Sequence, residues 1–191
     1  LNAASHQSAG YGVVARNNTV LRTKSACFHQ HYGRENLLEN NVFAFGRLEQ
    51  LARSRVEQHR SFSFERNIVI CSEGRLLGGD WGGDGFAMDR NIYWNTRRQA
   101  VDFAGVSFDE WRAKGHDTHS RVADPRFVDA ARGDFRLRRG SPARSTGFLP
   151  IPAMVLLHSA FVRSAEIMGN RRTIPAHEIR GGPIFASMPA K

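Results

Sequence analysis

The chain contains 191 residues, a length that suits a single domain. Its 27 Lys and Arg residues outnumber its 18 Asp and Glu residues, and the net charge of +9 favours acidic partners such as nucleic acid, anionic lipid or anionic polysaccharide. Because the arginines are dispersed rather than gathered in one basic run, the sequence argues against nucleic acid, and no apolar stretch is long enough to span a membrane.

Four short segments repeat one pattern, in which an asparagine is followed by a β-branched residue and then an apolar residue. The asparagines are spaced 23, 26 and 24 residues apart, at Asn18, Asn41, Asn67 and Asn91. A fixed period of about 20–50 residues is typical of solenoids and propellers. The leucine ladder of leucine-rich repeats is absent, and helical-pair repeats are longer, at about 33–47 residues.

The residues that follow each asparagine favour strands because they are β-branched and aromatic, as in IVI at 68–70 and IYW at 92–94. Short strands separated by turns, with one turn of chain per repeat, form a parallel β-helix whose neighbouring strands lie about 4.8 Å apart. The sequence therefore predicts an all-β fold, a single-stranded parallel β-helix.

The repeated asparagines have a structural role in such a fold. An amide side chain both donates and accepts hydrogen bonds, so stacked asparagines can bind one another and the buried turn. Asn also tolerates left-handed backbone at a tight corner.

In chain order, the coils are predicted at 11–33, 35–59, 61–85 and 86–103, so that about four coils occupy residues 1–106. The start lacks Met and the charged-then-apolar pattern of a signal peptide. An uncapped first coil would expose strand edges and core. We therefore expect the sequence to be the C-terminal part of a longer protein.

A capping segment is predicted at 107–148. Ser107 followed by Glu110 is a helix-start signal, and Gly115 is placed to end that helix. The segments DPRFVD (124–129), GDFRL (133–137) and GSPA (140–143) are expected to cover the open end of the solenoid. The tail at 149–191 has uncertain structure, with a short helix or strand at 154–158.

The two cysteines, Cys27 and Cys71, fall in different phases of the repeat and two coils apart. That placement argues against a disulfide on geometry. We expect two buried free thiols.

Two groups of residues resemble a known family. The three segments within 124–143 resemble the closing motif of secreted bacterial right-handed parallel β-helix proteins of the pectin-lyase-like superfamily. The segment FHQHYGREN (28–36) followed by ENN (39–41) resembles a carbohydrate-active subset, and the nearest is glycoside hydrolase family 141. The resemblance covers about residues 11–148. It implies a right-handed coil, a secreted or periplasmic protein, a polysaccharide partner and a monomer.

Such proteins bind a polymer along the outer face of stacked strands, so polar residues in the second half of each coil are the candidates. His29 and His31 are two apart and therefore share one face of a strand, with Gln30 opposite. Two imidazoles on one face can bind a metal or share proton transfer.

The predicted substrate-binding residues are His29, Tyr32, Arg34, Glu49, Arg53 and Trp81. Trp81, between pairs of glycines, is expected at an exposed loop tip where it stacks on a sugar; the alternative is that it packs beneath the loop.

Glycoside hydrolysis requires two carboxyl groups, about 5–5.5 Å apart for retention or about 6.5–9.5 Å for inversion. Carboxylates on adjacent coils can meet these separations. Glu57 and Asp80 form the first predicted pair, and Glu35 with Glu49 is the reserve. His31 and His59 are further catalytic candidates.

Two other functions remain open. A polysaccharide lyase would need a base and a cation, supplied by Arg53, His59 or His31, and only this alternative would involve Ca²⁺. The third possibility is a non-catalytic glycan-binding or structural module. Otherwise we expect no metal and no cofactor.

Overall fold

The computed structural model describes residues 4–5 and 8–151 and consists mainly of three parallel sheets. The first sheet contains β3 (Val14–Arg16), β6 (Asn36–Glu39), β9 (Phe62–Glu65) and β12 (Phe86–Asp89). The second contains β4 (Thr19–Leu21), β7 (Val42–Ala44), β10 (Ile68–Cys71), β13 (Ile92–Asn95) and β14 (Arg121–Val122). The third contains β5 (Ala26–Gln30), β8 (Glu49–Arg53) and β11 (Arg75–Gly79). A short hairpin, β1 (Ala4–Ser5) and β2 (Ser8–Ala9), precedes them.

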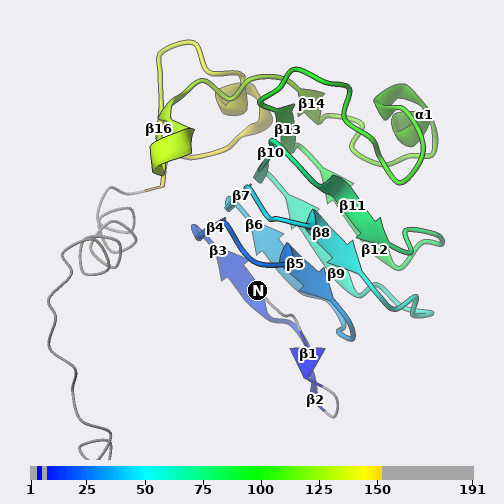
Figure 1. Cartoon of the computed structure of the whole chain (residues 1–191). Helices are drawn as coiled ribbons and strands as arrows, with labels where there is room; N and C mark the ends of the chain where they lie inside the picture. The colour runs from blue at the N-terminus through cyan, green and yellow to red at the C-terminus, as the bar shows by residue number, and fades with distance from the viewer. Residues whose placement is uncertain (1–3, 6–7, 152–191) are drawn as a thin grey trace, which may run out of the picture.

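The chain passes through the three sheets in turn, once per coil, and the strands stack in the order seen in Figure 1. Every strand pair within these sheets is parallel. Three coils have all three strands, and the fourth contributes only β12 and β13. The predicted parallel β-helix is therefore confirmed.

Phenylalanines from successive coils fill the interior. Phe43 and Phe64 stack with ring centroids 5.4 Å apart, and Phe62 and Phe86 stack at 6.0 Å. Phe28 meets Phe62 edge-on at 5.2 Å. These rings are almost inaccessible to solvent. Burying one such side chain contributes about 1.5–3 kcal/mol, so the stacked rings are a main source of the stability of the solenoid.

The asparagines form the predicted ladder between the first and second sheets. Asn41 donates to Asn67 Oδ1 from its backbone N at 2.9 Å and from Nδ2 at 3.0 Å. Asn18 binds Asn41 Oδ1 in the same way, and the backbone N of Asn67 donates to Asn91 Oδ1 at 2.8 Å. The amides thus satisfy buried backbone groups that the turn would otherwise leave without partners.

The left-handed residue at each corner is the one directly before the ladder asparagine. The φ angles are +59° at Asn17, +55° at Asn40, +53° at Arg66 and +58° at Arg90. The chain turns at that position from the first sheet to the second. The following asparagine can then point its backbone N–H and side chain along the stack toward the next coil.

A short helix covers the end of the core beyond the fourth coil, as expected. Helix α1 (Phe108–Ala113) starts with a capping box between Ser107 and Glu110. Its buried Trp111 stacks on Phe86 with centroids 5.9 Å apart, and Phe103 packs beside it. Figure 1 shows α1 at the same end of the stack as β11 and β12.

The segment at 124–148 does not cover the open end, contrary to our expectation. It contains β15 (Phe127–Asp129), η1 (Ala130–Arg132), β16 (Asp134–Leu137) and η2 (Pro142–Thr146). Its Phe127, Phe135 and Phe148 pack on a second apolar cluster with Val42, Ala44, Ile68, Ile70 and Ile92 from the second sheet. Strands of that sheet are apolar on both faces, and their outer face therefore needs a cover.

Both cysteines are buried thiols, as predicted, and neither forms a disulfide with another of the described residues. Burial raises the pKa of the Cys71 thiol to about 11.

None of the helices in residues 4–5 and 8–151 has the length and apolar character needed to cross a membrane. The helix or strand predicted at 154–158 lies outside the described residues.

Candidate functional site

Most of the predicted site residues lie on one edge of the solenoid. The connections that leave β5, β8 and β11 start at the same edge because these strands are parallel and in register. We call these connections, residues 31–35, 54–61 and 80–85, the loop edge. It contains His31, Tyr32, Arg34, Glu35, Glu57, His59, Asp80 and Trp81. Glu49 starts β8 at the other end, where its Oε2 lies 3.8 Å from Arg75 Nη2.

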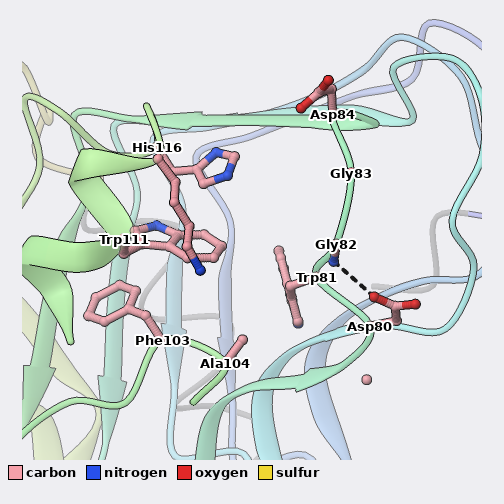
Figure 2. A pocket seen from close by; sticks show the side chains of 11 residues that line it. Asp80, Trp81, Gly82, Gly83, Asp84, Phe103, Ala104, Trp111 and His116 are labelled. Atoms are coloured by element: carbon pink, nitrogen blue, oxygen red, sulfur yellow. Dashed lines mark hydrogen bonds between the residues drawn. The ribbon is translucent and has the colours of Figure 1, made fainter. Parts of the chain in front are cut away.

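A cavity of about 630 Å³ lies where the last connection of the loop edge meets the helical cap. Figure 2 shows Asp80 and Asp84 on one wall and His116 with Trp111 on the facing wall. Both aspartates are exposed. The other lining residues are Gly79, Trp81, Gly82, Gly83, Phe103, Ala104 and Lys114.

Arg53 positions the aspartate loop from beneath. Its side chain has 0% exposure, and Nη1 donates to Gly82 O at 2.7 Å and to Asp80 O at 3.3 Å. Asp80 Oδ1 in turn accepts the Gly82 N–H at 2.8 Å. The predicted substrate-binding role of Arg53 was wrong, because the guanidinium packs on the Phe86 ring, 4.9 Å from its centroid, and is closed to solvent.

Gly79 is required at the end of β11, where it lies beside Arg53 of the parallel strand β8. Its φ is +85°, and a Cβ there would lie 2.0 Å from the carbonyl oxygen of Arg53. Any side chain would push the loop away from its anchor. The cavity wall thus depends on glycine at this position.

Trp81 is not at an exposed loop tip, so that expectation was wrong. It is 6% exposed, and its Nε1 donates to Gly78 O at 2.9 Å. The ring meets Phe86 edge-on at 5.2 Å. The alternative, packing beneath the glycine-rich loop, is what the structure shows, and Trp81 forms the floor of the cavity rather than a stacking platform.

His116 is the main cavity residue that the sequence did not reveal. Its ring stacks on Phe86, with centroids 4.8 Å apart, and also packs at a tilt against Trp111, at 4.4 Å. Burial lowers the pKa of His116, although the neighbouring Asp117 and Asp84 carboxylates oppose that shift. The imidazole is therefore neutral at pH 7, which suits a base or a hydrogen-bond partner for substrate.

The lowered pKa of His116 predicts a pH effect on stability. The unfolded chain takes up a proton at this histidine near pH 6.5, before the folded chain does, so the free energy of unfolding should fall as the pH drops through that range. Urea unfolding at several pH values should show a shallower fall for His116→Gln than for the unmodified protein. Parallel curves would contradict this assignment.

Glu57 ties two coils together and is not among the residues that line the cavity. Its Oε2 accepts from Gln30 Nε2 at 3.2 Å, Gly33 N at 3.1 Å and Ser61 Oγ at 2.9 Å. His59 Nε2 donates to Gly33 O at 3.0 Å beside it. The structure therefore does not bring the predicted Glu57–Asp80 pair together in this cavity.

The histidine pair lies where β5 meets the loop edge, with His29 in the strand and His31 in the first connection. His29 and His31 are half-buried, share one face and both contact Ser54, whereas Gln30 is fully buried, as predicted. Arg34 and Glu35 are exposed, with the Arg34 guanidinium 5.9 Å from the centre of the Tyr11 ring. Neither lines the cavity.

A second cavity of about 390 Å³ adjoins the first, because Asp84, Lys114 and His116 line both. It adds the charged residues Arg60, Glu65 and Asp89.

Within residues 4–5 and 8–151, no three His, Cys, Asp or Glu side chains are grouped so as to hold a metal ion. No family model, curated protein or solved structure matches the chain.

Proposed function

We propose that the chain binds a polysaccharide across the two adjoining cavities and hydrolyses a glycosidic bond beside Asp84. The observation that carries this proposal is the pairing of two exposed carboxylates, Asp80 and Asp84, on one cavity wall above aromatic rings. A polymer that enters from one cavity and leaves by the other must pass the shared wall formed by Asp84, Lys114 and His116.

The two carboxylates can divide the work that hydrolysis needs. One protonates the leaving oxygen, and the other acts as a base on water or as the nucleophile. Asp80 Oδ1 accepts the Gly82 N–H, which holds this carboxylate in place on the cavity wall, and we assign it the base or nucleophile role. Asp84 is assigned as the acid. This pair replaces Glu57 and Asp80, since Glu57 is occupied by three donors of neighbouring turns.

The family and location are part of the same proposal. The closing motif at 124–143 and the stacked parallel coils support a relation to the pectin-lyase-like proteins, and glycoside hydrolase family 141 is the nearest group. Such proteins are secreted or periplasmic, and the proposed polymeric substrate fits that location.

Turnover on a panel of neutral and uronate polysaccharides tests the proposal, with new reducing ends as the readout. Asp80→Asn and Asp84→Asn should each lower the rate at least about a hundredfold. Asp124→Asn is the matched control, because Asp124 is also exposed and its Oδ1 accepts a backbone N–H two residues on, from Arg126 at 2.7 Å. Full turnover in both cavity variants would overturn the assignment.

The products of the same reactions separate two competing functions. Lys114 and the neutral His116 in one cavity could neutralise a uronate carboxylate and remove the neighbouring proton, which is lyase chemistry. A lyase would yield an unsaturated uronate that absorbs ultraviolet light. Binding without product would instead indicate a non-catalytic module.

A further inference from the structure

Ser54 lies between two histidines on the loop edge, outside both cavities. It directly follows β8 and is exposed. Its Oγ is 2.7 Å from His29 Nε2 and 2.9 Å from His31 Nδ1. A hydroxyl has one proton and can also accept, so Ser54 Oγ can donate to one imidazole while it accepts from the other. With His29 Nε2 as the acceptor, Oγ–H donates to His29 and His31 Nδ1–H donates to Oγ. The alternative acceptor, Gln30 O, is farther away at 3.3 Å.

Neighbouring coils hold these three side chains in place. The Ser54 backbone N–H donates to Gln30 O at 2.9 Å, which fixes the serine against the first coil. His31 rests edge-on against the Tyr32 ring at 4.6 Å. The Arg55 guanidinium lies 4.8 Å from the centre of that ring and donates to the Tyr32 hydroxyl.

The approach to the serine is also open. The residue of β8 in register with His29 is Ala52, so the strand places no bulky side chain next to the imidazole. A hydroxyl that faces solvent and donates to an imidazole nitrogen is the arrangement that activates serine for attack on a carbonyl.

We propose that Ser54 is the nucleophile of a second catalytic site, with His29 as its general base, and that this site hydrolyses acyl esters of alcohols such as O-acylated sugars. Ser54 Oγ attacks the ester carbonyl carbon while its proton passes to His29 Nε2. The bond between the acyl carbon and the alcohol oxygen then breaks, and the leaving alcohol takes that proton. Water then attacks the acyl carbon while His29 takes one of its protons, the bond from that carbon to Ser54 Oγ breaks, and His29 returns the proton to Oγ as the acid leaves. Throughout, His31 Nδ1–H is a hydrogen-bond donor beside the reacting oxygen of the serine, Ser54 Oγ.

The test uses 4-nitrophenyl acetate for turnover and a fluorophosphonate for covalent labelling of the full chain. We expect one phosphonyl adduct, located on Ser54 by peptide mass spectrometry. Ser54→Ala should abolish the adduct and lower ester turnover at least about a hundredfold. Ser145→Ala is the matched control, because Ser145 is also exposed but its Oγ donates to a carbonyl, Pro142 O, at 2.8 Å.

Histidine variants distinguish the base from its neighbour. His29→Gln keeps a polar group at the Nε2 position but no basic nitrogen, so both labelling and turnover should fall about a hundredfold. His31→Asn keeps an N–H near Nδ1 and should lose less than His31→Ala. Unchanged unfolding curves show that each variant is folded. An adduct on another residue, or turnover that survives Ser54→Ala, would overturn the proposal. Because polysaccharide hydrolysis is measured separately, failure of one site leaves the other assignment standing.

Discussion

Replacement of Asp117 by alanine is expected to lower the free energy of unfolding by about 3–5 kcal/mol. This carboxylate is 0% exposed. Its Oδ1 accepts from Asn91 Nδ2 at 2.9 Å and from Ser120 Oγ at 2.5 Å, and its Oδ2 accepts from Trp111 Nε1 at 2.9 Å. The Tyr93 hydroxyl lies 3.0 Å from both oxygens. Alanine would leave four buried donors without a partner where the asparagine ladder meets the cap.

Urea unfolding measures this effect, and Asp117→Asn sharpens the test. Asparagine keeps the volume, but its NH₂ group would face donors rather than accept from them, so most of the loss should remain. Asp109→Asn is the control, since Asp109 is an exposed carboxylate of α1 paired with the exposed Arg112, and its change should stay below about 0.5 kcal/mol. A loss below about 1 kcal/mol in Asp117→Ala would show that the cap does not depend on this carboxylate.

The second large effect is expected at the centre of the ladder, where Asn67→Ala should cost about 3 kcal/mol. Asn67 is 0% exposed. Its Oδ1 accepts twice from Asn41, and its Nδ2 donates to Leu38 O at 2.9 Å. Alanine would remove one acceptor and one donor from a region without access to solvent, so the buried partner groups of two coils would lose their hydrogen bonds.

The position along the ladder provides an internal control for this prediction. Asn18 is half-buried at the first rung and donates to Arg16 O at 3.0 Å. Water can reach the groups that Asn18→Ala would uncover, so the loss there should be about 1 kcal/mol. Equal losses at both rungs in chemical unfolding would contradict the view that burial sets the cost.

The repeating part of the fold could be predicted from the sequence because its cause is local and periodic. Asn18, Asn41, Asn67 and Asn91 recur with each coil, and the backbone N–H of each of the first three donates to Oδ1 of the next asparagine. The capping box of Ser107 and Glu110 was equally readable, since a helix start depends on residues three apart. The position of the segment at 124–148 could not be predicted in this way. The strands Val42–Ala44 and Ile68–Cys71 are apolar on both faces, however, and that pattern does indicate that their outer face is covered.

The candidate sites were only partly predictable. Asp80 and His31 directly follow the ends of stacked strands, and the repeat alone places them on one edge. Asp84, Lys114 and His116 come from irregular turns, and no spacing in the sequence connects them. They share a wall because Trp111 docks on Phe86 at the end of the core, which folds residues 114–117 back toward the third coil.

The sequence by itself determined the coil period, the ladder and the start of the capping helix, because these depend on hydrogen bonds that each repeat makes in the same way. Only the tertiary structure decided which polar residues face solvent. Arg53 and Trp81 look like binding residues in the sequence, yet both are buried and support the loop of Asp80 from below. Burial depends on what packs over a residue, and here that cover comes from the non-repeating turns and the cap.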